Sequence, residues 1–231
     1  MQRDVSSSFE AGRKWIGGLF SQYSCLIKVC LMPKIVDHDE RRTDIVRAII
    51  KVVGEGGLAG ATVRSIAREG GFSSGVIAHY FANKDEMVRY AFEFVADRVF
   101  RRIDARLKQA LGVDRVRVIL EEHVPISKLD EETAVALAFW EMALHDPELR
   151  ALFRDKYRRW RDYLRLELGP LLPDLAPDAI DRRVDLAVAM ADGLLVTFAL
   201  DGKNYRQIDR RAILDDLMTL IGLEDHKAKA A

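Results

Sequence analysis

The fold is decided by the segment Thr62–Lys84, which reads TVRSIAREGGFSSGVIAHYFANK. Thr62 is a favourable N-cap residue for a short helix, and Ser73 is equally suited to open a second helix that ends at Tyr80. Between them, Gly71 provides the turn, because glycine adopts left-handed backbone angles without steric strain. The segment therefore predicts two short helices joined by a tight turn.

Helices are also predicted on both sides of this segment. Upstream, the apolar residues at helical spacing are Ile45, Ala48, Ile49, Val52 and Val53. We expect this first helix to end at the glycines of residues 54–57. Downstream, Asn83 as N-cap and Glu86 three residues later form a capping box, which opens a long helix to about Leu111.

Two short helices packed on a first helix are typical of a helix-turn-helix, whose second helix enters the major groove of DNA. Ala67 is small where the two helices cross, and Phe81 is expected in the core. The apolar wedge between the helices consists of Ile66, Phe72 and Ile77. The positions expected to face base edges are Ser73, Ser74, Val76 and His79.

The charge of the chain excludes binding to DNA through positive charge alone. The 231 residues hold 36 Lys and Arg against 36 Asp and Glu, so the formal net charge is zero. The formal charge is +2 over residues 1–32, +1 over residues 33–85 and −3 over residues 86–231. Because phosphate binding by charge alone needs a larger Lys and Arg excess, contacts must depend on geometry and a few placed side chains.

The remaining sequence stays helical and contains no alternating pattern long enough for a strand. Helices are expected to start at residue 113, at Asp130, at Asp146-Pro147 and at Pro177. The helix from Pro177 is expected to end at Asp201-Gly202, and a final helix to span residues 209–221. The chain is therefore predicted to be all-α with about nine helices. Its expected parts are a poorly ordered extension (1–32), a three-helix helix-turn-helix domain (33–85) and a helical ligand-binding and dimerisation domain (86–231).

The N-terminal extension offers little chemistry. Cys25 and Cys30 are the only cysteines and make neither a zinc set nor a disulfide framework, so we expect a reducing cytoplasm. No apolar stretch reaches the roughly 18–20 residues that span a membrane. Translation starting at Met32 instead of Met1 is a further expectation.

The segment Thr62–Lys84, with its caps, its turn glycine and the Tyr80-Phe81 pair, resembles the DNA-binding domain of the TetR family of bacterial regulators. The resemblance covers residues 38–90. It implies phosphate contacts from Thr62, Tyr80 and Lys84 and adds Arg64 to the DNA-binding candidates. A Lys at a helix N-terminus is locally unfavourable, which a phosphate partner explains.

The C-terminal part is similar to the ligand-binding region of the BetI-type branch of this family. The similar stretches are Leu137–Leu149, the segment around Trp160, Leu171–Pro173 and Asp192–Leu194. The resemblance implies a ligand-responsive repressor that binds a palindromic DNA operator and is released by a small-molecule effector. The alternative is a helical protein-interaction module that binds no DNA.

The helix around residues 134–144 is apolar on almost every face except at Glu141, and it is expected to be central. The candidate ligand pocket consists of Phe139, Trp140, Glu141, Trp160 and Asp192. Aromatic faces beside an acid suit a cationic ligand. Glu141 could instead point to a groove or pair with an arginine of the next helix, and Asp192 could face either the pocket or a subunit interface.

A helix-turn-helix reads palindromic half-sites as a dimer. The apolar helix from Asp181 to Leu200 and the helix over residues 209–221 are therefore expected to form a two-fold homodimer interface. The sequence holds no catalytic motif, no metal-ligand set and no cofactor-binding loop, so no enzyme activity, metal or cofactor is expected.

Overall fold

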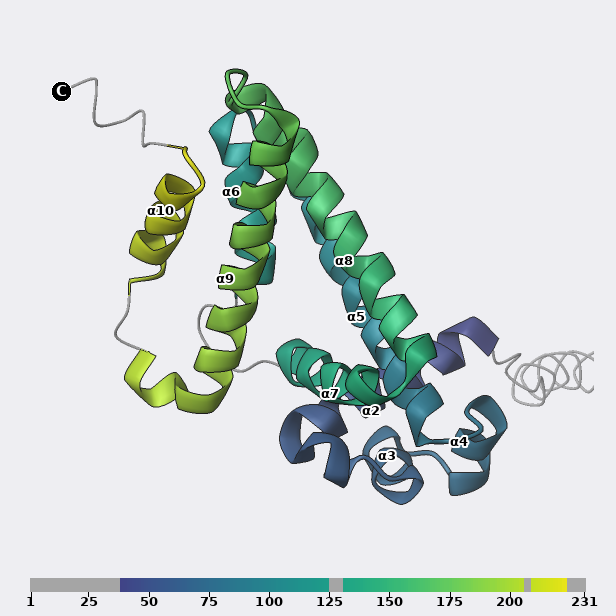
Figure 1. Cartoon of the computed structure of the whole chain (residues 1–231). Coiled ribbons are helices and arrows are strands. Elements are labelled where there is room, and N and C mark those ends of the chain that lie inside the picture. The colour runs from purple at the N-terminus through teal and green to yellow at the C-terminus, as the bar shows by residue number, and fades with distance from the viewer. Residues whose placement is uncertain (1–37, 125–130, 206–208, 224–231) are drawn as a thin grey trace, which may run out of the picture. The chain divides into compact units, whose positions relative to one another are not determined.

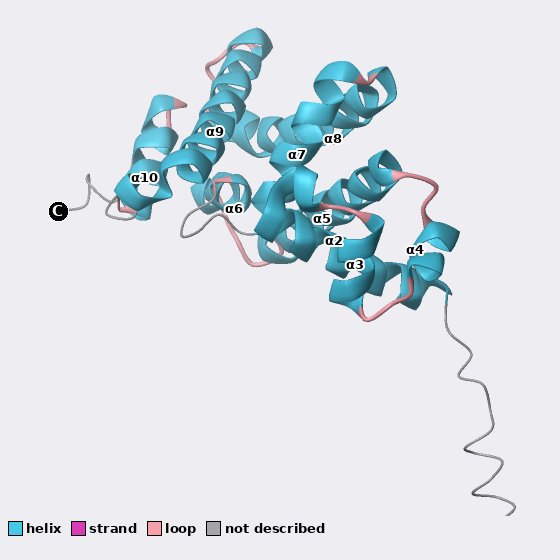
Figure 2. Cartoon of the chain, turned by 90° about the horizontal axis from the view of Figure 1, so that it is seen from below, coloured by secondary structure: helices cyan, strands magenta, loops and turns pink. Residues whose placement is uncertain are grey.

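The computed structural model of the chain describes residues 38–124, 131–205 and 209–223. Within these ranges it consists of nine α-helices and one short 3-10 helix, without a strand (Figures 1 and 2), which confirms the all-α prediction. The helices are α2 (His38–Gly60), α3 (Val63–Gly70), α4 (Ser74–Tyr80), α5 (Lys84–Leu107), α6 (Val113–His123), α7 (Glu131–His145), α8 (Pro147–Leu168), α9 (Pro177–Tyr205) and α10 (Arg210–Leu220), with η1 (Gly169–Leu171) after α8.

Local capping chemistry explains most helix boundaries. Ser73 accepts a hydrogen bond from the Val76 amide (3.3 Å), and Asp146 accepts from the Glu148 amide (2.7 Å) ahead of Pro147 in the first turn of α8. These starts confirm the predicted caps, because such side chains satisfy amides that the first helical turn leaves unpaired.

The first predicted helix breaks at Gly57 (φ 62°, ψ −169°), within the glycines where its end is predicted, and further helical turns continue to Gly60. Two other predicted boundaries are wrong in detail. α5 ends at Leu107, short of Leu111, whereas α9 runs past Asp201-Gly202 to Tyr205. Local sequence patterns do not predict at which residue a helix ends, because tertiary packing also affects its length.

The capping box at the start of α5 also differs from its prediction. Asn83 accepts from the Glu86 amide (2.8 Å), as expected. The Glu86 carboxylate, however, accepts from the Ala82 amide (2.7 Å), one residue before the N-cap. The predicted extension 1–32, its two cysteines, Met32 and the cap at Asp130 lie outside the described residues.

The buried side chains form two clusters that α5 connects. The first core joins α2, α3 and α4 to the first half of α5, to α7 and to the start of α8. The second core joins the second half of α5 to α6, α8, α9 and α10. α5 therefore takes part in both cores. None of the helices in the described ranges is long and apolar enough to cross a membrane.

Candidate nucleic-acid interface and ligand cavity

The turn between α3 and α4 is built as the sequence predicts. The Thr62 hydroxyl accepts from the Ser65 amide (3.1 Å), and the Ser65 hydroxyl accepts from the Thr62 amide (2.9 Å). Gly71 adopts the left-handed conformation (φ 68°), which ends α3 and turns the chain towards α4. Ile66 and Ile77 are fully buried, so the two helices are fixed against each other.

One side of α4 is exposed and carries only small or neutral groups. The residues of this outward arc are Ser74, Gly75, Ala78 and His79. Ile77 is buried, while Val76 and Tyr80 are half-buried against the first core. Val76 is therefore less accessible than the sequence suggested, because it packs partly against the first core. Phe81 is 2% exposed, which confirms it as core.

The other DNA-binding candidates lie at the ends of these helices. Arg64 is exposed in the first turn of α3, and Lys84 is half-buried as the first residue of α5. The Tyr80 ring meets the His79 ring edge-on, with centroids 5.4 Å apart. Their contacts with DNA stay predictions.

A cavity of about 150 Å³ lies among α5, α6, α7, α8 and α9. Its walls are mainly aromatic and aliphatic, and Trp140, Trp160 and Asp192 of the predicted pocket line it. The other lining groups used below are Phe92, Phe100, Arg102, Glu122, His123, Glu132, Lys156 and Tyr157. Three of the five residues of the predicted pocket therefore line one cavity, and α5 and α6 supply more of its wall.

Two of the predicted pocket residues, Phe139 and Glu141, do not line this cavity. Phe139 is fully buried in the first core, where it stacks on Phe92 with centroids 3.8 Å apart. It lies behind a lining residue and does not itself line the cavity. Glu141 is exposed at the surface and does not line this cavity either. Each helical residue turns by about 100°, so neighbours of Trp140 face other directions.

Asp192 of α9 is one of the carboxylates that line the cavity. It accepts a hydrogen bond from the Tyr157 hydroxyl (2.8 Å). Burial raises the pKa of Asp192 to about 6, although the Tyr157 hydrogen bond opposes this rise. Burial and the nearby carboxylate raise the pKa of Tyr157, so its hydroxyl stays a donor.

His123 is a neutral wall of the cavity. Its ring stacks on Trp160 with centroids 3.5 Å apart, and Nδ1 lies 3.2 Å from the Ile119 carbonyl oxygen. Burial lowers the pKa of His123 to about 3, and the positive charge of Arg102 acts in the same direction. The imidazole therefore remains uncharged at neutral pH, with Nδ1 as the donor to Ile119.

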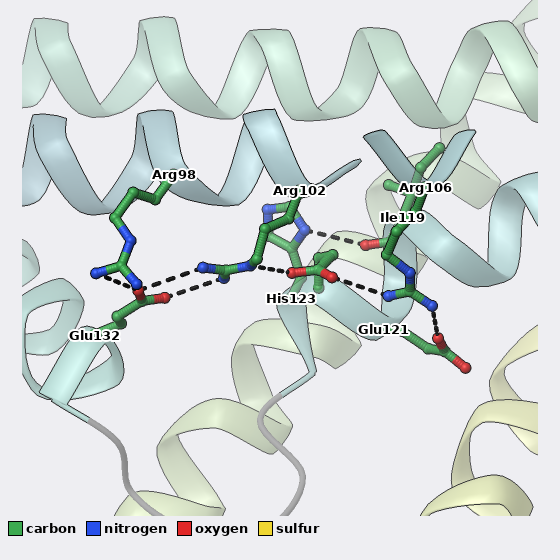
Figure 3. A network of polar contacts seen from close by, with 8 residues as sticks. Arg98, Arg102, Arg106, Ile119, Glu121, His123 and Glu132 are labelled. Atoms are coloured by element: carbon green, nitrogen blue, oxygen red, sulfur yellow. Dashed lines mark hydrogen bonds and ion pairs between the residues drawn. The ribbon is translucent and has the colours of Figure 1, made fainter. Parts of the chain in front are cut away.

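Three other charged groups of the cavity, Arg102, Glu122 and Glu132, belong to a network of ion pairs across three helices (Figure 3). Arg102 of α5 contacts Glu122 of α6 (2.6 Å) and Glu132 of α7 (3.0 Å). Arg98 also contacts Glu132 (3.3 Å), and Arg106 contacts Glu122 (2.9 Å). The network neutralises the two glutamates and holds α6 and α7 against α5.

Two buried donors at the cavity have no partner. The indole Nε1 atoms of Trp140 and Trp160 are buried without a hydrogen-bond acceptor among the described residues. A buried unsatisfied donor is costly, so such groups indicate that a water or ligand oxygen accepts from them. Glu122 and Glu132 are already paired with arginines, so Asp192 is the lining carboxylate that favours a positively charged ligand.

Sequence reasoning missed the α5 and α6 contributions to this cavity. The available signal was the spacing of Arg98, Arg102 and Arg106, which places three cations on one helical face. Their acidic partners come from α6 and α7, 15 to 34 positions later in the sequence. Only the packing of the helices brings these charges together.

Comparison with known proteins agrees with this architecture. Residues 45–91 match the family described as "Bacterial regulatory proteins, tetR family", and residues 112–221 match "BetI-type transcriptional repressor, C-terminal". The HTH-type transcriptional regulator BetI of Stenotrophomonas maltophilia is 33% identical over 186 residues, which are 79% of this chain and 93% of that protein. The HTH-type transcriptional regulator PksA of Bacillus subtilis is 39% identical over 110 residues, which are 47% of this chain and 52% of PksA.

A solved structure of a transcriptional regulator from Saccharomonospora viridis, in complex with choline, has the same fold. Its TM-score is 0.69 at 24% sequence identity, over 79% of this chain and 97% of that one.

Proposed function

Because the chain belongs to the TetR family of bacterial transcriptional regulators, we propose that it is a repressor that binds a palindromic operator as a homodimer. Its relatives are transcriptional regulators and not enzymes, and the family binds DNA and small molecules. We further propose that a small-molecule effector in the cavity releases the protein from DNA. The predicted division at residues 33–85 and 86–231 matches these two tasks.

The observation that carries the DNA-binding proposal is the exposed outward arc of α4, held by a capped turn. Ser73 and Gly71 fix where α4 begins, and Ile77 anchors its inner side in the first core. An arc fixed in this way suits the major groove, which admits one α-helix. Arg64 and Lys84 flank it and would contact phosphates.

Dimerisation is supported by an exposed stripe on α9. Its residues are Leu186, Ala189, Gly193, Val196 and Leu200, which follow the 3-4-3-4 spacing of a helix-helix seam. Leu186 is 58% exposed and Leu200 is 83% exposed in the single chain. Leu220 on α10 is also exposed, so a second copy would cover both helices.

The cavity suits a small organic cation that also carries an oxygen. A cavity of this volume holds a ligand about as large as benzene. Trp140, Tyr157 and Trp160 provide aromatic faces for a cation, and Asp192 provides a carboxylate. An oxygen of the ligand would accept hydrogen bonds from the indole N–H groups, which lack a partner among the described residues. Choline, which the Saccharomonospora viridis regulator binds, has this chemistry.

α7 would carry the signal between the two sites. Thr133, Ala136 and Trp140 line the cavity, while Val135 and Phe139 on other faces of α7 pack in the first core with α2 to α5. A ligand that shifts α7 would therefore move the supports of α4. Operator half-sites lie about 34 Å apart, so a change of a few Å in the separation of the two α4 helices would weaken DNA binding.

The test is a gel-shift with the duplex upstream of the chain's own gene, at low and physiological salt. We expect binding that a small organic cation reverses in wild type and reverses much less in Asp192→Asn. The absence of binding even at low salt would favour the protein-interaction module instead. Binding that no cation reverses would leave the DNA proposal standing and refute the effector class.

A further inference from the structure

We propose that α4 reads its operator mainly through thymine methyl groups, with the duplex lying close against the backbone at Gly75. This inference rests on the proposed function, since it concerns how the same α4 surface selects DNA. It is carried by two separate observations, the chemistry of the outward arc and the empty space beside Gly75.

The outward arc lacks the side chains that identify guanine or adenine. Arg, Lys, Asn and Gln form the bidentate pairs that distinguish these bases in the major groove, and α4 (Ser74–Tyr80, SGVIAHY) contains none of them. It offers a hydroxyl at Ser74, a methyl at Ala78 and an imidazole at His79. The methyl of an alanine packs against the C5-methyl group of thymine, so Ala78 is the residue of the arc suited to direct readout without polar pairing.

Gly75 is not required by the packing of the protein. A Cβ built there meets only the Ser73 hydroxyl at 3.8 Å, which is ordinary contact. Gly70 is different, because a Cβ there would lie 2.3 Å from the Phe72 ring. A glycine inside a helix weakens that helix, so its presence at position 75 needs another reason. A surface outside the chain that approaches the α4 backbone supplies that reason.

The two observations point to the same geometry. Gly75 and Ala78 are three positions apart and share one side of α4. A duplex that comes close at Gly75 therefore meets the Ala78 methyl at the same time. Close approach brings this short side chain within reach of a thymine methyl, which a longer side chain at position 75 would prevent.

The experiment uses the full-length chain and duplexes that it enriches from a randomised pool. Each enriched duplex is then made again with dU in place of dT, which removes the C5-methyl group and leaves base pairing unchanged. We expect the half-sites to contain thymine under α4, and we expect Kd to rise about fourfold for each contacted methyl group removed. Substitution outside the half-sites should leave Kd unchanged.

Ala78→Gly provides the matched protein control, with folding checked by its melting temperature. In this variant the dU duplex and the dT duplex should bind alike, because the methyl partner on the protein is gone. If dU throughout the half-sites changes wild-type Kd by less than about 1.5-fold, thymine readout is overturned while the repressor proposal stands. If no duplex is enriched at any salt concentration, the proposed function itself fails, and this inference with it.

Discussion

The substitution Gly75→Ala should raise stability and reduce DNA affinity, two effects that a purely structural glycine would not combine. In the folded protein the new methyl group meets only the Ser73 hydroxyl at 3.8 Å, so it causes no clash. Replacing a helical glycine by alanine restricts the unfolded chain and stabilises by about 0.4–1 kcal/mol. For a chain of this size, that raises Tm by about 1–4 °C.

The effect on DNA binding has the opposite sign. Forcing one methyl group into a closely packed contact costs about 1–3 kcal/mol, which weakens binding by roughly 5- to 150-fold for each half-site that a dimer contacts. Thermal melts measure the first effect, and fluorescence anisotropy with an enriched duplex measures the second.

Gly56→Ala is the control for this prediction. Gly56 is exposed in α2, and a Cβ there meets nothing within 4 Å, so the same change in composition occurs away from the outward arc. We expect a similar change in Tm with unchanged DNA affinity. Unchanged DNA affinity in Gly75→Ala would refute the close approach of the duplex to α4. A lower Tm in this variant would refute the statement that a methyl group at position 75 fits the folded protein without a clash.

Three further predictions test other parts of the protein. Lys84→Ala should weaken binding to all duplexes and reduce the slope of log Kd against log salt by about 2 for a dimer; an unchanged slope would contradict the phosphate contact. Leu200→Glu should shift the dimer towards monomers in sedimentation, whereas Leu166→Glu, at a leucine on α8 that is 69% exposed, should not. The folded protein keeps His123 neutral between pH 6.5 and pH 5, because the pKa of its buried imidazole is near 3. The imidazole of the unfolded chain gains a proton over the same range, so acidification lowers the free energy of unfolding by up to about 2 kcal/mol. Asp192 opposes this, because its folded pKa near 6 lies above the ordinary 3.8, so the folded state takes up the proton first. His123→Gln should therefore lose less stability at pH 5 than wild type in urea unfolding, and equal losses would contradict the buried neutral imidazole.

The helix-turn-helix segment could be predicted closely because its helix caps and turn residues act locally. Thr62, Gly71 and Ser73 act on amides and turns within three residues of themselves, so their types and spacing determine α3 and α4. Val76 is the exception, since its partial burial depends on how α4 packs against the first core.

The cavity could be predicted only in part because its wall comes from five helices. Phe139, Trp140 and Glu141 are consecutive, yet one is core, one lines the cavity and one is exposed. Composition identified the helix correctly, but its rotation depends on which neighbours it packs against. The Tyr157–Asp192 hydrogen bond joins residues 35 positions apart, so no local sequence pattern predicts it.

The continuous α5 has a mechanical consequence. It begins at the proposed phosphate contact Lys84 and passes the cavity at Phe100, about 24 Å further along the helix axis. If α5 pivots at the cavity, a tilt of only about 5° displaces its Lys84 end by about 2 Å. Two protomers tilting in opposite senses would double this change between their half-sites. On the proposed function, a ligand about as large as benzene that causes such a tilt would take the protein out of register with its operator.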